Sequence, residues 1–256
     1  MCIAYLSVGH PEWPLLIAAN RDEFHSRASS PAAPWAGHPT LIAGRDLVAG
    51  GTWLGWTQPG RFGFLTNYRE PSHTPPPNAP SRGTLVRDFL LGDDTAEDYL
   101  QGILAHARDW AGFNLIVGDL GGVWYLSNRD PASVTRRLTG GRYVLSNHLL
   151  DTPWPKATRL RTCLDALAPE QWAANPDAVL TALRDTTQAS GNALPDTGLE
   201  RGFEQLLSSP FIVSPNYGTR CSTVIAVAST GETLFCEQSY SPDGQPRERH
   251  DWRFGE

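Results

Sequence analysis

The stretch from Cys2 to Glu23 reads CIAYLSVGHPEWPLLIAANRDE and contains two apolar runs separated by a turn. The runs cover residues 2–8 and 15–19, and their composition favours strands. A Gly-His-Pro turn at residues 9–11 separates them. The second run ends in the polar residues 20–23, where a strand delivers side chains to a sheet edge or a site. The pattern predicts two antiparallel strands whose polar end returns beside Cys2.

Strand and helix patterns alternate along the rest of the chain. Strands are predicted over residues 62–68, 113–119, 123–126, 141–147, 219–228 and 233–238, with an edge strand at 252–254. Helices are predicted over 81–91, capped by Ser81, over 95–108, capped by Asp93 or Asp94, and over 156–167 and 176–187. Loops are predicted at 28–40, 69–80 and 188–216, and residues 71–80 hold five prolines. This order predicts an α+β fold with helices on the faces of antiparallel sheets, in a single domain over residues 1–256.

The composition excludes several classes of partner. The chain has 256 residues, of which 40% are hydrophobic, and a net charge of −6 from 21 basic and 27 acidic side chains. A nucleic-acid or anionic-membrane partner would require clustered Lys and Arg, so neither is expected. Lys156 is the only lysine among these basic residues, a bias that we attribute to genome composition. Since the chain shows no signal-peptide pattern and no apolar run of about 18 residues, we expect a soluble cytoplasmic protein without stable membrane insertion.

The four cysteines lack the spacing of a metal or dithiol site. Cys2, Cys163, Cys221 and Cys236 form no C-x-x-C pair, which argues against zinc, a redox dithiol and c-type haem attachment. Zincin, P-loop, hydrolase-elbow and dinucleotide motifs are also missing from the sequence. We expect Cys163 and Cys236 in the core, and Cys221 to point away from the direction of Arg220.

Cys2 is the strongest candidate for chemistry. A small residue after Met1 permits removal of the initiator, which places a thiol beside an α-amine with a pKa of about 7.7 to 8. One residue then supplies both nucleophile and base, and Arg21 is the candidate cation that would favour the thiolate. The alternative is that Cys2 is a buried small hydrophobic residue at the start of a strand.

Polar residues at predicted strand ends support the catalytic interpretation. An acyl-transfer site needs a nucleophile, a group that orients the amine, and hydrogen-bond donors for the oxyanion. Arginine and asparagine side chains suit the last two roles. The candidates are Arg21, Asp22, Asn67, Asn147 and Arg220. Arg21 and Asp22 could instead form a structural ion pair, and Arg220 could cap a strand.

Several motifs in order along the chain resemble the NRDE family, which includes the transport and Golgi organisation protein 2 homologues. They are Asn-Arg-Asp-Glu at 20–23 after a Met-Cys start, Gly-Thr-Trp-Leu-Gly at 51–55, Thr-Asn-Tyr at 66–68, Gly-Phe-Asn-Leu at 112–115, Leu-Ser-Asn at 145–147 before Thr-Pro-Trp at 152–154, and Tyr-Gly-Thr-Arg at 217–220. The resemblance implies a four-layer αββα sandwich similar to the N-terminal nucleophile hydrolases, with two mainly antiparallel sheets.

The same resemblance implies roles for the candidate residues. Cys2 would be the nucleophile and Arg21 the cation near its thiol. Asn67 and Asn147 would be oxyanion-hole or substrate-orienting amides, and Arg220 the second arginine of the site. Asp22 matches less closely, because the amine-binding aspartate of the cysteine branch lies a few residues beyond the arginine, whereas here the two are adjacent. Adjacent strand residues point to opposite faces, so either the strand bulges or only one of them lines the site.

Two functions follow from this resemblance. The first is an N-terminal cysteine hydrolase that cleaves a non-peptide amide bond in a small acylated molecule and requires no cofactor. The alternative is a binding and trafficking protein for haem or acyl-CoA-like lipids that uses the same pocket without turnover. Under that alternative, the candidate axial ligands for haem are His25, His38, His106 and His148. Either way the partner is a small-molecule or lipid-like ligand, and a scaffold role through the proline-rich loop is a third, weaker hypothesis.

Overall fold

The computed structural model describes residues 2–58 and 60–255, which divide into two compact units. Unit 1 holds the described residues up to Ser26, together with Gly140–Ser146 and those from Leu150 onward. Unit 2 holds Arg27–Thr139 and Asn147–Leu149. The prediction that residues 1–256 form a single domain stays a prediction.

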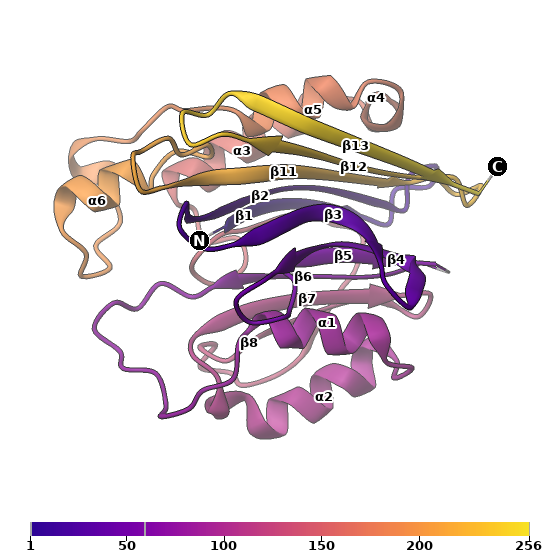
Figure 1. Ribbon diagram of the computed structural model, residues 1–256, viewed down its shortest axis with the longest axis horizontal. Helices are drawn as coiled ribbons and strands as arrows, with labels where there is room; N and C mark the ends of the chain where they lie inside the picture. Colours follow the sequence, from indigo (N-terminus) through magenta and orange to yellow (C-terminus); the bar gives the residue numbers. More distant parts are fainter. Residues whose placement is uncertain (1, 59, 256) are drawn as a thin grey trace. The chain divides into compact units, whose positions relative to one another are not determined.

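A six-stranded antiparallel sheet organises unit 1, in the order β10-β1-β2-β11-β12-β13 (Figure 1). The predicted hairpin at its centre is confirmed, because β1 pairs with β2 antiparallel and Cys2 lies opposite Arg21. The second strand continues through the polar residues rather than stopping before them. The strands are β1 (Cys2–Val8), β2 (Leu15–Phe24), β10 (Gly141–Leu145), β11 (Tyr217–Val227), β12 (Thr233–Tyr240) and β13 (Pro246–Phe254).

Helices cover one face of this sheet (Figure 1). They are α3 (Pro155–Asp165), α4 (Pro169–Ala174) and α5 (Pro176–Leu183). Leu16, Ala18 and Val224 point to this helical face and share a buried cluster with Leu160 and Trp172. Since alternate strand residues share a face, Asn20 and Asp22 continue the helix-facing row of β2, and Arg21 points the other way.

Unit 2 is built on a seven-stranded antiparallel sheet in the order β3-β4-β5-β6-β7-β8-β9. Its strands are β3 (Ser29–Trp35), β4 (His38–Asp46), β5 (Leu54–Thr57), β6 (Arg61–Asn67), β7 (Phe113–Asp119), β8 (Gly122–Ser127) and β9 (Arg136–Leu138). The helices α1 (Gly83–Leu91) and α2 (Ala96–His106) lie side by side on this sheet (Figure 1) and bury Phe89, Leu100 and Leu115 in one cluster. A 3-10 turn, η1 (Ala107–Asp109), extends α2.

Several local predictions are wrong. The predicted loop at 28–40 is mostly strand, because it contains β3 and the start of β4. The predicted loop at 188–216 contains η2 (Gly191–Ala193) and α6 (Arg201–Leu206). The side chain of Thr95, not an aspartate, caps α2, and Ser81 makes no side-chain cap on α1, whose N-cap residue is Arg82. Cys163 is exposed on α3 rather than buried.

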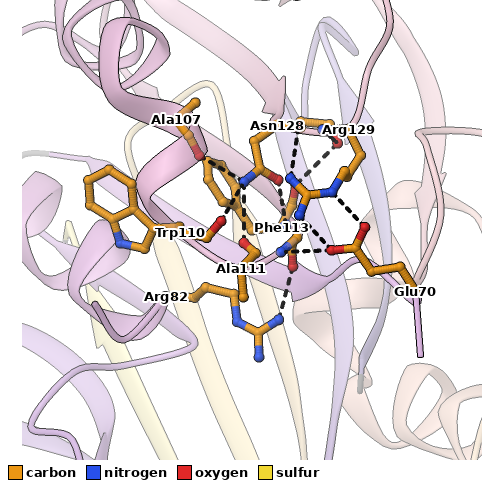
Figure 2. Close-up of polar contacts among 10 residues, drawn as sticks. Glu70, Arg82, Ala107, Trp110, Ala111, Phe113, Asn128 and Arg129 are labelled. Carbon is orange, nitrogen blue, oxygen red and sulfur yellow. Dashed lines mark hydrogen bonds and ion pairs between the residues drawn. The ribbon is translucent and has the colours of Figure 1, made fainter. Parts of the chain in front are cut away.

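The proline-rich segment 71–80 is a loop, as predicted, and hydrogen bonds of Glu70 and Arg82, both labelled in Figure 2, fix its two ends to Gly112. Glu70, directly before the loop, accepts two 2.6 Å hydrogen bonds from Arg129 and one of 3.2 Å from the Gly112 N–H. Arg82, just after the loop, donates to the Gly112 carbonyl at 2.9 Å. Asn128 stabilises the turn before Gly112 by donating from its side-chain amide to three backbone carbonyls, those of Ala107, Trp110 and Ala111.

Candidate functional site

Cys2, Arg21 and Cys221 form a row across three neighbouring strands of unit 1. Cys2 lies opposite Arg21 in the pairing of β1 with β2, and Arg21 lies opposite Cys221 in the pairing of β2 with β11. Directly opposed residues share a face, so all three side chains lie on the face that α3, α4 and α5 do not cover. Arg21 and Cys221 are buried, whereas Cys2 is partly exposed. The row therefore brings the candidate nucleophile and the candidate cation together.

A bulge in β11 resolves the relation between Arg21 and Asp22. Arg21 pairs with Cys221 but Asp22 pairs with Thr219, so Arg220 is the extra residue of β11. The second strand itself stays regular, and Arg21 and Asp22 point to opposite faces of the sheet. Bulges of this kind are frequent beside active sites, where they redirect a side chain.

Arg220 turns toward the end of β2. Its guanidinium donates to the carbonyl of Phe24 at 3.0 Å and to that of His25 at 3.5 Å. Burial and the nearby positive charge of Arg21 lower the pKa of Arg220. Two cations therefore lie at one end of the sheet, which suits an anionic group. The prediction that Cys221 points away from Arg220 assumed regular alternation, and the bulge interrupts that alternation.

Asp22 is buried on the helical face. Its Oδ1 accepts a 2.7 Å hydrogen bond from the hydroxyl of Thr219. Burial raises the pKa of the Asp22 carboxyl, while the positive charge of Lys156 and the Thr219 hydrogen bond act in the opposite direction. Lys156 lies in the first turn of α3 and is 1% exposed. Sequence reasoning missed Lys156 as a site residue, although its being the only lysine was a visible signal.

The environment of Cys2 disfavours its thiolate in this chain. Burial raises the pKa of the Cys2 thiol, and the negative charge of Asp22 adds to the effect. A hydrogen bond from the Asp22 backbone and the positive charge of Arg21 lower the pKa of this thiol. The backbone carbonyl of Cys2 accepts a 3.3 Å hydrogen bond from Ser146, which fixes the start of β1 to the end of β10. A hydrogen bond therefore holds the backbone at Cys2, while burial favours the protonated form of its thiol.

Glu237 is a second site residue that the sequence did not reveal. It is 2% exposed on β12 and accepts a 3.2 Å hydrogen bond from Thr223. The Cys221 thiol hydrogen-bonds to the same carboxyl, and burial together with the charge of Glu237 raises the pKa of Cys221 well above its ordinary value. Cys221 is thus a buried thiol whose thiolate is disfavoured, whereas Cys2 is partly exposed and remains the nucleophile candidate of the row.

The two candidate asparagines lie in unit 2. Asn147, which follows Ser146 directly in the chain, donates from its side-chain amide to the backbone carbonyl of Asn67 at 3.0 Å. Its own carbonyl accepts from the Arg69 N–H at 2.8 Å. The structure thus brings Asn67 and Asn147 together, and it brings Cys2 and Arg21 together in unit 1. The oxyanion-hole role of the asparagines stays a prediction.

The four histidines proposed as axial ligands are dispersed over the chain. Nε2 of His25 lies 3.0 Å from the Ser214 carbonyl, and the ring of His148 packs against Tyr68, with burial lowering the pKa of His148. His38 and His106 are exposed on β4 and α2. Among the described residues, no group of three or more His, Cys, Asp or Glu side chains could hold a metal ion. Haem as a ligand therefore stays a hypothesis.

Comparison with known proteins establishes the relationship that the motifs indicate. The model of a family described as Transport and Golgi organisation 2 matches residues 1–242. The chain belongs to the Transport and Golgi organisation 2 family. This confirms the NRDE-family prediction. Within the part of the chain that the structure describes, no helix is both long enough and apolar enough to span a membrane.

Relatives within the Transport and Golgi organisation 2 family align over most of the chain. The Transport and Golgi organization 2 homolog of Mus musculus is 34% identical over 260 residues, which cover 93% of each protein. The Homo sapiens homolog is also 34% identical over 260 residues, which again cover 93% of each protein. Transport and Golgi organization protein 2 of Drosophila melanogaster is 27% identical over 278 residues, or 98% of this chain and 97% of that protein.

A solved structure is similar to this family member in fold. It is the Caenorhabditis elegans ortholog of N-acylethanolamine-hydrolyzing acid amidase, with a TM-score of 0.50 and 11% identity over 88% of this chain and 92% of that one. At this identity the similarity concerns the fold alone. It confirms the predicted α+β class, with two antiparallel sheets and helices, and agrees with a fold of the N-terminal nucleophile hydrolase type.

Proposed function

We propose that this family member is an N-terminal cysteine amidohydrolase that cleaves a non-peptide amide bond in a small acylated molecule. The observation that carries the proposal is the placement of Cys2 opposite Arg21, with the buried Asp22 next in the strand. The amidase named in the structural comparison has a similar fold, which is a supporting analogy.

Removal of Met1 is the step that activates the site in this proposal. It converts the backbone nitrogen of Cys2 into an α-amine, a base with a pKa of about 7.7 to 8 beside the thiol. The amine takes the thiol proton, and the Arg21 cation stabilises the thiolate that forms. The Asp22 carboxylate, one residue beyond Arg21, then holds the resulting ammonium.

The reaction runs in two stages. The Cys2 sulfur attacks the amide carbonyl, the C–N bond breaks, and the leaving amine takes a proton from the Cys2 ammonium. Water then attacks the thioester, with the α-amine accepting its proton, and releases a carboxylic acid and the thiol. The products are the acid and the amine of the original amide, and no cofactor takes part.

The test is acylation of the processed protein by N-acyl-4-nitroanilides of increasing chain length, followed by absorbance and by intact mass after acid quenching. Parent protein should lose the mass of Met1, release nitroaniline and carry the acyl group on the peptide that begins with Cys2. Cys2→Ala and a chain with one residue inserted before Cys2 should both be inactive. Cys163→Ser, at the exposed cysteine of α3, is the matched control and should retain full activity.

Full activity in the chain with the insertion would refute the role of the α-amine. Activity in Cys2→Ala would refute the nucleophile. Saturable binding of haem or of an acyl-CoA by a parent protein that never forms an acyl-enzyme would replace the proposal with the binding alternative.

A further inference from the structure

The single lysine of the chain occupies a position that the general bias toward arginine does not explain. Twenty of the 21 basic side chains are arginine, and the exception, Lys156, is buried at 1% exposure. Lysine has a compact ammonium group, whereas the guanidinium of arginine is planar and larger, so the two are not equivalent in a closed space. A buried lysine also requires a partner of opposite charge.

The position of Lys156 in the fold identifies that partner. Lys156 lies in the first turn of α3, directly before Ala157, which packs in the cluster between α3 and the sheet. The helix-facing row of β2 continues through Asn20 to Asp22 at the end of the strand. Asp22 is 1% exposed and feels the positive charge of Lys156. Lys156 and Asp22 are therefore a buried cation and a buried carboxyl on the helical side of the sheet of unit 1.

We propose that Lys156 is the positioning residue of the Cys2 site, whose ammonium holds Asp22 as an oriented carboxylate from the helical side of the sheet. The inference deepens the proposed function, on which its catalytic consequence rests. The Thr219 hydroxyl fixes one oxygen of Asp22 at 2.7 Å, and Lys156 supplies a positive charge that favours the ionised form of this carboxyl. The amino group at the start of the chain, Arg21 and the Cys2 thiol are further ionisable groups that act on this carboxyl.

The test compares Lys156→Met, Asp22→Asn and the double variant in a mutant cycle, with unfolding in urea measured from pH 4 to pH 8. Coupling predicts that the double variant is no less stable than the worse single variant. It also predicts that the stability gap between parent and Lys156→Met widens as the pH rises. Burial already raises the pKa of Asp22, and loss of the Lys156 charge raises it further. At high pH the folded variant must then either keep Asp22 protonated or bury an unpaired carboxylate, and both lower its free energy of unfolding relative to the parent.

A second readout reports the site rather than the fold. The pH midpoint for alkylation of Cys2, on protein lacking Met1, should fall in Lys156→Met. Without the Lys156 charge the Asp22 carboxyl stays protonated to higher pH, and its negative charge then no longer raises the pKa of Cys2. Asp22→Asn should move it in the same direction, and the double variant no further. Arg159→Met is the matched control, since Arg159 lies on the same helix, is exposed and pairs with Asp185 at 2.7 Å.

Additive stabilities, a stability gap independent of pH, or an unchanged alkylation midpoint would each overturn the positioning role. If Lys156→Met does not fold but the double variant does, the pair is coupled and the inference holds. If neither folds, Lys156 is structural and the inference fails. The cycle needs no substrate, so a coupled pair in a protein that never forms an acyl-enzyme would refute the hydrolase proposal alone.

Discussion

Asn20 provides the clearest test of how the site is held in place. Its amide nitrogen donates to the carbonyls of Leu183 and Pro210, both at 2.8 Å, and its oxygen accepts from Ser222 at 2.6 Å. Asn20 is 1% exposed, so water does not replace these partners. The substitution Asn20→Asp keeps the size and shape of the side chain but replaces the two donors by an oxygen.

The expected loss of stability in Asn20→Asp follows from the two backbone carbonyls that lose their hydrogen-bond donor. A buried polar group without a partner costs about 1–3 kcal/mol, so both together cost about 2–6 kcal/mol when the new carboxyl is ionised. A protonated carboxyl can still donate to one of the two carbonyls, which limits the loss to about 1–3 kcal/mol. Burial raises the pKa of such a carboxyl in the folded state. The variant therefore loses stability as the pH rises from the unfolded pKa of about 3.9 to the raised folded value.

The assay is urea unfolding followed by tryptophan fluorescence at pH 4, 6 and 8, with parent protein measured at each pH. Asn192→Asp is the matched control, because Asn192 is exposed and the change there should stay within about 0.5 kcal/mol. If Asn20→Asp is as stable as this control, or if its deficit does not grow with pH, then Asn20 does not connect β2 to α5 in the way described.

Two further predictions concern the backbone and the thiol. Gly51→Ala should cost about 3 kcal/mol or more in urea unfolding, because the added Cβ would lie 2.4 Å from the Gly83 carbonyl carbon at the start of α1. Gly50→Ala, where φ is +72° but nothing lies within 4 Å, should cost about 1–2 kcal/mol, and equal losses would contradict the packing argument. In protein that retains Met1, Cys2 should be alkylated more slowly than the exposed Cys163 at pH 7, because burial raises the pKa of Cys2. Peptide mapping after a short exposure to iodoacetamide checks this, and preferential labelling of Cys2 would contradict it.

The sequence predicted those helices and strands whose pattern of apolar and polar residues matches their burial in the fold. The apolar runs that became β1 and β2 are buried on both faces, so they read as strands without ambiguity. The strand β3 contains Pro31 and Pro34, which resemble a loop, but β3 is an edge strand whose outer side needs no donors. The short helix α6 falls in a polar stretch with too few residues to show a helical period.

The sequence predicted only those site contacts that follow from the pairing of two neighbouring strands. Opposing Cys2 and Arg21 requires nothing beyond a regular hairpin with a known turn, and the prediction that Arg21 returns beside Cys2 is confirmed. Cys221 lies opposite Arg21 because of the bulge at Arg220. The residue pattern does not predict which of the two strands contains the extra residue. Glu237 and Lys156 meet their partners through contacts between distant segments, which periodicity does not encode.

The adjacency of Arg21 and Asp22 has a physical consequence. In a regular strand the two side chains must leave opposite faces, and the bulge lies in β11, so β2 keeps its alternation. Arg21 therefore acts on the Cys2 side of the sheet, and Asp22 acts from the helical side at the end of the strand. Burial raises the pKa of the Asp22 carboxyl, and the buried Lys156 of α3 is a cation whose charge favours the ionised form. The burial of Lys156 and the adjacency of Arg21 and Asp22 thus have one explanation, because the side chain that follows Arg21 enters the helical side of the sheet and a carboxyl there is stabilised by a cation.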